Sequence, residues 1–125
     1  MKYSSTRGAV KRIGFKEAVM MGLAEDGGLL VPDEFPQVHD RLQEWKSLPF
    51  QQLCLEIMEL FVCQALNRDA LEGLINRSFA SFRHPLITPV KKLKTYSVLE
   101  LFHGPTFAFK DVALQFLGNL FQKLE

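Results

Sequence analysis

The sequence has neither a long apolar run nor an apolar leader, and these absences exclude a membrane span and a secretory signal. The first residues, "MKYSSTRGAVKR", lack the apolar segment that a secretory signal carries. No stretch approaches the roughly 18 consecutive apolar residues that a transmembrane helix needs. The chain of 125 residues is 47% hydrophobic and 23% charged, which is ordinary for a soluble globular domain. We therefore expect a cytoplasmic protein with no membrane partner.

Cysteine is scarce, because the chain has only Cys54 and Cys63. Both fall in one helical pattern, nine residues apart. This spacing puts them on opposite faces of a helix and about 13 Å apart along its axis. A disulfide between them is excluded if the helix is intact. We expect free thiols, as in a reducing compartment.

No excess of one charge is present, since 15 basic residues face 14 acidic ones and the net charge is +1. The densest basic run is "KKLK" at 91–94, which a solvated strand or turn explains. A nucleic-acid-binding surface needs a basic patch or stripe, and the sequence has none. We expect no nucleic-acid partner.

The sequence also lacks a metal-ligand pattern and a glycine-rich phosphate loop. The histidines, His39, His84 and His103, share no metal spacing with one another or with the cysteines. "DGG" at 26–28 has no strand–loop–helix context, so it is interpreted as a turn. We expect no metal site.

Hydrophobic periodicity predicts a mixed, helix-rich α/β chain. Asp69 and Glu72 have the spacing of a capping box at the start of a helix. The pattern changes from helices to strands near residues 83–85. The expected strands are 2–6, 29–32 and two within 84–104, and the expected helices are 15–23, 38–46, one from Phe50, one after Asp69 and one from Phe109.

The segment "HGPTFAFKD" at 103–111 places Lys110 where a helix begins. The first turn of a helix carries positive partial charge, which disfavours a cation. The apolar residues of 109–124 cover one arc, and Lys110 falls inside it, between the directions of Leu117 and Phe121. Burying an unpaired ammonium is costly, so either its charge is neutralised or the amine does chemistry. The alternative is that the side chain only reaches past apolar neighbours to water. The polar positions expected opposite this arc are Asp111, Gln115, Gly118 and Gln122.

Four further residues are candidate contacts for a ligand. His103 lies in the turn that presents Lys110 and is a candidate for its location alone. Thr106 is expected to cap the helix that follows, a structural role that we favour over catalysis. In "SSTRG" at 4–8, Thr6 and Arg7 offer a hydroxyl and a guanidinium to an anion. The alternative there is a solvated strand end.

Taken in order, "YSSTRG", "GLAEDGGLLVP" and "LELFHGPTFAFKD" resemble the threonine synthase family, and the resemblance covers essentially the whole chain. It implies a pyridoxal-phosphate enzyme of fold type II that converts O-phospho-L-homoserine and water to L-threonine and phosphate. It also implies that Lys110 is the catalytic lysine, which forms a Schiff base with pyridoxal phosphate. Thr6, Arg7, His103 and Thr106 are then weaker candidates for contacts with this small-molecule substrate.

The resemblance implies a domain division and an incomplete site. Residues 1–84 would form the threonine synthase N-terminal domain, and residues 85–125 would begin the pyridoxal-phosphate-dependent catalytic domain. Fold type II sites lie between two domains, and the loop for the cofactor phosphate would follow Glu125. We therefore expect a carbon–oxygen lyase for the full-length parent and no turnover by the 125 residues alone.

Two alternatives stay open. The chain is either part of a threonine-synthase-like phospho-lyase, which the same N-terminal motifs do not separate from a synthase, or a non-catalytic interaction module. In the second case, its apolar last helix would be exposed and would mediate self-association.

Overall fold

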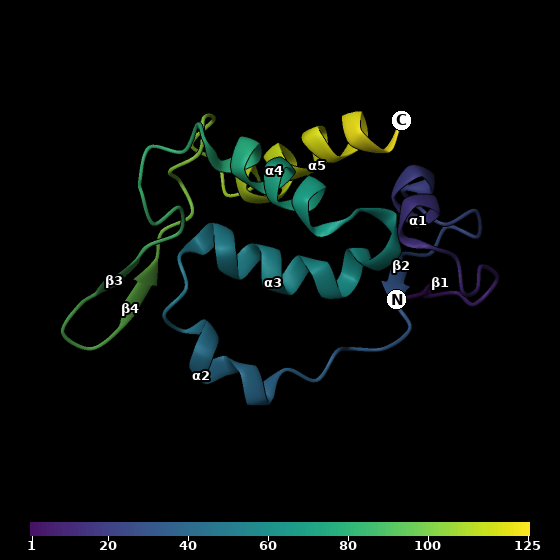
Figure 1. Cartoon of the computed structure of the whole chain (residues 1–125), viewed down its shortest axis with the longest axis horizontal. Helices are drawn as coiled ribbons and strands as arrows, with labels where there is room; N and C mark the ends of the chain where they lie inside the picture. Colours follow the sequence, from purple (N-terminus) through teal and green to yellow (C-terminus); the bar gives the residue numbers. More distant parts are fainter. The chain divides into compact units, whose positions relative to one another are not determined.

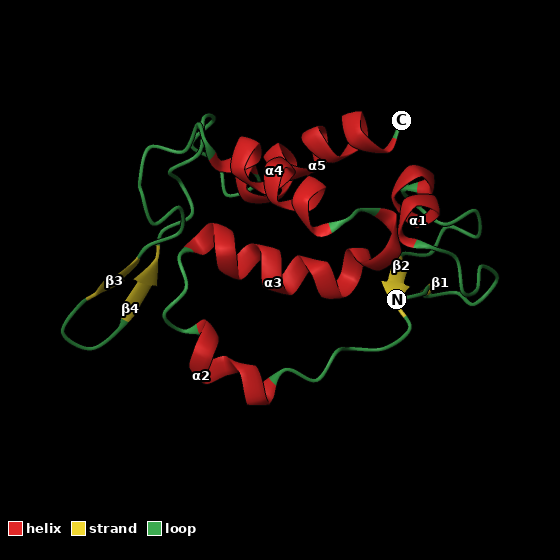
Figure 2. Cartoon of the chain, in the orientation of Figure 1, coloured by secondary structure: helices red, strands yellow, loops and turns green.

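The structure is a computed structural model that describes residues 1–125, apart from the side chain of Cys63. It confirms the predicted mixed, helix-rich α/β class (Figures 1 and 2). The chain divides into two compact units, which are described separately: Met1–Ser47 with Glu56–Leu71, and Leu48–Leu55 with Glu72–Glu125. The elements are β1 (Tyr3–Ser5), α1 (Phe15–Met21), β2 (Leu30–Pro32), the 3-10 helix η1 (His39–Arg41), α2 (Leu42–Trp45), α3 (Phe50–Val62), η2 (Cys63–Ala65), α4 (Arg68–Phe79), β3 (Val90–Lys92), β4 (Ser97–Leu99) and α5 (Asp111–Leu124).

In the first unit, Tyr3 joins three parts of the chain. β1 and β2 pair antiparallel with Tyr3 opposite Pro32, and Tyr3 also forms a β-bridge with Ile13. The buried Tyr3 ring lies 5.9 Å from the Phe15 ring, and its hydroxyl donates a 2.7 Å hydrogen bond to the Phe61 carbonyl. A buried tyrosine needs such a partner for its hydroxyl. Tyr3 thus fastens the N-terminal strand to α1 and to the end of α3.

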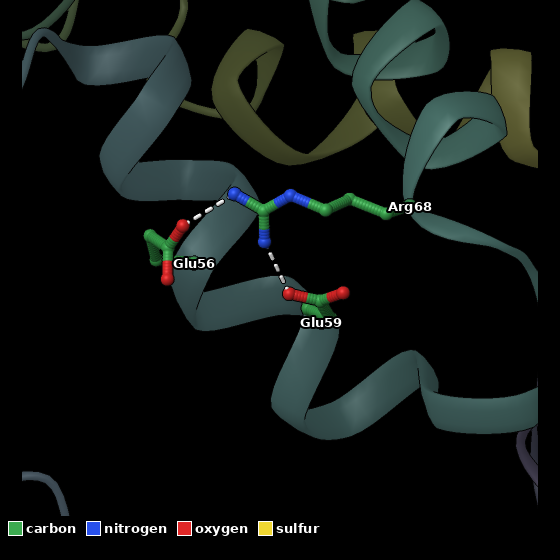
Figure 3. Close-up of polar contacts among 3 residues, drawn as sticks. All are labelled: Glu56, Glu59 and Arg68. Atoms are coloured by element: carbon green, nitrogen blue, oxygen red, sulfur yellow. Dashed lines mark hydrogen bonds and ion pairs between the residues drawn. The ribbon is translucent and has the colours of Figure 1, made fainter.

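The corner between α3 and α4 in the first unit is held by one arginine (Figure 3). Arg68, the first residue of α4, forms ion pairs with Glu56 and Glu59 of α3. The two carboxylates are three residues apart on one helix, so they face the same way. Their hydrogen bonds and charges, those of Glu56 foremost, raise the pKa of Arg68. The sequence analysis did not single out this cluster.

The start of α4 corrects one prediction. The Asn67 side-chain oxygen accepts a 2.8 Å hydrogen bond from the Ala70 N–H, so Asn67 caps the helix. The predicted capping box of Asp69 and Glu72 is wrong, because the helix begins at Arg68 and Asp69 already lies in its first turn.

The core of the second unit is built on α4. Leu74 and Ile75 are fully buried, and Phe79 packs edge-on against Phe50 and Phe82, with ring centroids 4.8 Å and 5.2 Å apart. Edge-to-face packing of this kind suits the charge distribution of aromatic rings. The apolar side chains of α4 therefore face the core of this unit.

A partly buried hydrogen-bond chain joins α5 to α4, which lie side by side in Figure 1. Ser78 is buried and donates to the Leu74 carbonyl at 2.7 Å. The Asn119 side-chain amide donates to the Ser78 oxygen at 3.2 Å and to the Gln115 carbonyl at 2.9 Å. Buried polar groups need partners, and this chain supplies them.

The predicted strand pair in 84–104 is confirmed. β3 and β4 form an antiparallel hairpin with Val90 opposite Leu99 and Lys92 opposite Ser97. The side chains of both strands are exposed within this chain.

Two further observations concern membrane-spanning helices and the cysteines. No helix among the described residues is both long enough and apolar enough to cross a bilayer. Cys54 is a free, half-buried thiol, and burial raises its pKa to about 11. The predicted absence of a disulfide also concerns the Cys63 side chain, which lies outside the described residues.

Candidate cofactor site

A buried carboxylate organises the turn before α5. Asp111 is only 2% exposed, and its carboxylate accepts hydrogen bonds of 2.9 Å from the Thr106 N–H and from the Thr106 hydroxyl. The Gln115 side chain donates a longer one of 3.3 Å. Two predictions are corrected here. Thr106 does not cap α5, because its hydroxyl bonds to Asp111, and Asp111 does not lie on the solvent side of the helix.

The carboxylate of Asp111 is held in its charged form. Desolvation by burial raises the pKa of this group, but the hydrogen bonds from Thr106, Gln115 and the backbone outweigh it. The net result is a pKa below the ordinary value for aspartate. Hydrogen bonds that favour the charged form act in this direction, so Asp111 is an anion at neutral pH.

Gly104 is required by the same carboxylate. A Cβ atom at this position would lie 2.4 Å from the Asp111 Cβ and 2.5 Å from its Oδ2. No side chain fits into that distance without displacing the backbone. The Gly, Thr and Asp of "HGPTFAFKD" therefore form one local unit, in which glycine gives room and Thr106 donates to Asp111.

The middle of the turn has an unusual backbone. Phe107 has φ of 62°, in the left-handed region that bulky residues rarely adopt. Its N–H donates a 3.2 Å hydrogen bond to the Gly104 carbonyl, which closes the turn. The Phe107 and Phe109 side chains are each 65% exposed. Both rings, from the residues immediately before and after Ala108, are therefore largely exposed to solvent.

Lys110 is the residue immediately before α5. Its carbonyl accepts hydrogen bonds from the N–H groups of Ala113 and Leu114, so its backbone is part of the first turn. The side chain is exposed, which agrees with the alternative that it reaches past apolar neighbours to water. No carboxylate among the described residues forms an ion pair with its ammonium group. Lys110 thus presents an accessible amine on a turn held by Asp111.

His103 is held by neighbours in its own unit. Its Nε2 lies 3.0 Å from the Glu100 carboxylate, and its side chain is 17% exposed. Its ring is tilted against the rings of Phe102 and His84, with centroids 4.5 Å and 4.8 Å away. His103 directly precedes the 104–110 turn. It therefore lies in the same segment of the chain as Thr106 and Lys110.

Thr6 and Arg7 lie in the first unit, on a turn after β1. Thr6 pairs with Leu29: its N–H donates to the Leu29 carbonyl at 2.8 Å, and its hydroxyl accepts from the Leu29 N–H at 3.0 Å. One Arg7 nitrogen donates to the Asp26 carbonyl at 3.0 Å. Both side chains are exposed. The two residues therefore belong to one turn that folds onto residues 26–29.

Asp26 is the residue that sequence analysis missed in this turn. Its carboxylate accepts hydrogen bonds from the Ser5 hydroxyl at 2.6 Å, the Gly28 N–H at 2.9 Å and the Ala9 N–H at 3.0 Å. These bonds, the one from Ser5 foremost, lower the pKa of Asp26. The available signal was the Asp-Gly-Gly run, since an aspartate often bonds to the backbone two residues on.

The first two motifs of the sequence are therefore one structural feature. A Cβ at Gly28 would lie 3.0 Å from the Thr6 hydroxyl and 3.1 Å from the Arg7 nitrogen. The glycine lets the two turns approach each other. The predicted turn at 26–28 is confirmed. As for metals, no group of three or more His, Cys, Asp or Glu in the described part of the chain is arranged to hold an ion.

Comparisons with known proteins agree on one family. The profile of the family "Threonine synthase N terminus" matches residues 2–79. The chain is 51% identical to the threonine synthase of Schizosaccharomyces pombe, over 98% of this chain and 24% of that protein. It is 45% identical to threonine synthase-like 2 of Xenopus laevis, over 96% of this chain and 26% of that protein.

A solved structure shows the same fold. The PLP-bound threonine synthase of Brucella melitensis superposes with a TM-score of 0.95 at 36% identity, over 99% of this chain and 27% of that one. The chain thus spans about a quarter of the length of the relatives that it matches and corresponds to their N-terminal region. On the match to residues 2–79 and the shared fold, the chain belongs to the threonine synthase N-terminus family.

Proposed function

We propose that this chain supplies part of the active site of a pyridoxal-phosphate-dependent threonine synthase, with Lys110 as the residue that attaches the cofactor. The observation that carries the proposal is the exposed Lys110 amine, which has no ion pair with a described residue and stands on a turn held by Asp111. An accessible amine is the group that condenses with an aldehyde. The Brucella melitensis relative, whose structure is PLP-bound, supports the choice of cofactor.

The residues around Lys110 fit such a group. The exposed rings of Phe107 and Phe109, which precede Lys110 by three residues and one residue, offer apolar surface, and the N-terminus of α5 offers positive partial charge. When bound, pyridoxal phosphate supplies an electron sink for carbanionic chemistry on an amino acid. The chain supplies a fixed amine, whose Nζ in its neutral form accepts and returns substrate protons.

For the reaction, we propose conversion of O-phospho-L-homoserine and water to L-threonine and phosphate. Arg7 and Thr6 would contact an anionic group of the substrate, because the exposed guanidinium has donors beyond the one bonded to Asp26. His103 and Thr106 would contact substrate from the turn that carries Lys110. We retain the proposed domains 1–84 and 85–125, with the synthase site completed by further polypeptide.

Attachment of the cofactor is tested directly on this chain. The protein is mixed with pyridoxal phosphate, reduced with borohydride and digested, and the modified lysine is identified by mass spectrometry. We expect Lys110 to carry most of the label and Lys110→Arg to lose it. Lys123→Arg, which changes an exposed lysine at the other end of α5, is the matched control and should leave labelling unchanged. Equal labelling of Lys123 and Lys110 would contradict the proposal.

The phospho-lyase alternative rests on one comparison. The chain is nearly as similar to the threonine synthase-like 2 protein of Xenopus laevis as to the Schizosaccharomyces pombe synthase. The test is product analysis with O-phospho-L-homoserine, using a longer polypeptide that contains this chain. Phosphate release with an equal amount of threonine supports the synthase, and phosphate release without threonine supports the lyase.

A second candidate function is self-association through apolar surface. α5 exposes Leu114 and Phe121, whereas Leu120 and Leu124 of the same helix are buried. Exposed apolar patches mark contact surfaces. Light scattering over a concentration series tests this. A mass that rises with concentration, and falls back in Leu114→Gln with Phe121→Gln, supports association. A constant monomer mass contradicts it.

A further inference from the structure

Arg83 makes three contacts with the turn that presents Lys110, and the proposed function gives it no role. Its backbone N–H donates to the His103 carbonyl at 2.9 Å. Its Nη1 donates to the Gly104 carbonyl at 3.1 Å. Its guanidinium carbon lies 4.3 Å from the centre of the Phe107 ring, within the range of a cation–π contact. One residue therefore contacts positions 103, 104 and 107.

Two of these contacts act on the strained part of the turn. The Gly104 carbonyl accepts both the Phe107 N–H and the Arg83 guanidinium, so it is shared by the turn and by Arg83. Phe107 has φ of 62°, and such a conformation persists only when its surroundings hold it. Arg83 holds both ends of that turn, by a hydrogen bond at Gly104 and by ring contact at Phe107.

Asp111 holds the same turn from within. Its carboxylate binds Thr106, and its own N–H donates to the Ala108 carbonyl at 3.0 Å. Lys110 follows Phe107 by three residues, so rotation at Phe107 would move the Lys110 amine. We propose that Arg83 is a positioning residue that keeps the 104–107 turn in the conformation from which Lys110 attaches its cofactor, an inference that rests on the proposed function.

The chemistry of the contacts requires arginine rather than any cation. A guanidinium is planar, so it can stack on the Phe107 ring while one N–H points at the Gly104 carbonyl. A lysine ammonium is a compact point charge that makes one of these contacts well at a time. Arg83→Lys should therefore keep part of the stabilisation of the turn. Arg83→Ala should remove both side-chain contacts and leave only the backbone hydrogen bond to His103.

The experiment measures hydrogen exchange of the turn amides in the 125-residue chain without cofactor. In Arg83→Ala, we expect the amides of 104–111 to exchange about 10-fold faster, the change expected for losing a hydrogen bond from a charged donor. In Arg83→Lys the increase should be smaller. Arg77→Ala is the matched control, since Arg77 is an exposed arginine of the same unit whose side chain forms no hydrogen bond or ion pair with a described residue. It should leave 104–111 unchanged.

A second readout connects the turn to Lys110. The yield of pyridoxyl-Lys110 after borohydride reduction should fall in Arg83→Ala, recover partly in Arg83→Lys and stay at the unmodified level in Arg77→Ala. Faster turn exchange together with a lower yield supports the inference. Unchanged exchange in Arg83→Ala overturns it, and so does faster exchange with an unchanged yield.

A folding defect is separated by a second variant. If Arg83→Ala speeds exchange throughout α4 as well, Phe107→Leu decides, because it removes the ring contact and leaves the bond from Arg83 to Gly104. Faster exchange confined to 104–111 in Phe107→Leu supports the inference, and unchanged exchange there overturns it. If the proposed function itself is wrong, the result is different: Lys110 is not labelled by pyridoxal phosphate and borohydride even in the chain without substitutions.

Discussion

At the scale of residues, contacts of Asp111 hold the turn that carries Lys110. Asp111 is buried and charged because Thr106 donates two hydrogen bonds to it, and Gly104 gives way to its side chain. A buried charge is tolerated only with such partners. Asp111, the residue after Lys110, is therefore a buried acid that holds the turn, whereas the Lys110 side chain is exposed to solvent.

The Gly104 contact predicts a large effect from a single methyl group. We expect Gly104→Ala to lower the free energy of unfolding by about 1–3 kcal/mol, the usual cost of overpacking. Gly118→Ala is the control in the same unit, because a Cβ there meets nothing within 4 Å and alanine favours the helix by up to about 1 kcal/mol. Urea unfolding of both variants measures this. A Gly104→Ala protein as stable as the parent would contradict the close approach.

Asp111 also predicts an acid-dependent stability. Its pKa is lower in the folded chain than the ordinary 3.8, so the group binds fewer protons folded than unfolded. Its contribution is fully present above the unfolded pKa and is lost as pH falls through the folded pKa. We therefore expect Asp111→Asn to be destabilising at pH 7 and less destabilising near pH 2.

Unfolding midpoints at both pH values check this expectation. Asp26→Asn should behave alike in the first unit, since the pKa of Asp26 is also lowered by its hydrogen bonds, from Ser5 first. A difference between Asp111→Asn and the parent that stays constant with pH would show that Asp111 acts only through its shape.

At the scale of elements, helix ends are set by side chains that the periodic pattern does not reveal. α4 begins where Asn67 accepts a hydrogen bond from Ala70, and Arg68 then bonds to Glu56 and Glu59 of α3. Both contacts satisfy or neutralise groups at the start of one helix. The corner between α3 and α4 in the first unit is therefore fixed by polar contacts.

The cap of α4 is tested by comparing two substitutions. We expect Asn67→Ala to cost about 1 kcal/mol of stability, the usual value for losing an N-cap. Glu72→Ala should change stability by less than half of that, because the structure shows no capping bond from Glu72 within the described residues. Thermal unfolding by circular dichroism measures both. A larger loss in Glu72→Ala would restore the capping box.

At the scale of the whole molecule, the chain carries apolar surface that its own fold leaves uncovered. Nine large apolar side chains are exposed in the second unit between the end of α4 and the start of α5. They are Leu86, Val90, Leu93, Tyr96, Val98, Leu99, Phe102, Phe107 and Phe109. The relatives are about four times as long as the chain, so a surface of this kind suits contact with further polypeptide.

This surface leads us to predict attachment without turnover. The 125-residue chain should label at Lys110 with pyridoxal phosphate and borohydride, yet it should release no more than a trace of phosphate from O-phospho-L-homoserine. The reason is that most substrate and cofactor contacts would come from elsewhere, so the transition state is not stabilised. A phosphate-release assay checks this, with a full-length threonine synthase as positive control. Many turnovers per chain would contradict the prediction.

The sequence by itself determined the fold class, the positions of most helices and strands, and the family. Periodicity and turn residues are local signals, so Phe50–Val62 and the hairpin of β3 and β4 follow from them. The three ordered motifs led to the family because they keep residue types at fixed spacing. Lys110 was singled out for the same local reason, its place at the start of a helix.

Only the tertiary structure decided which polar groups meet. Asp26 and Ser5 are 21 residues apart, and Arg83 and Gly104 are also 21 apart, so no periodic pattern joins them. The position of Lys110 likewise depends on the turn before α5, which the hydrogen bonds from Thr106 to Asp111 hold. Such contacts form between residues that are distant in the sequence and that only the folded turns bring together. Composition and local spacing therefore do not predict them.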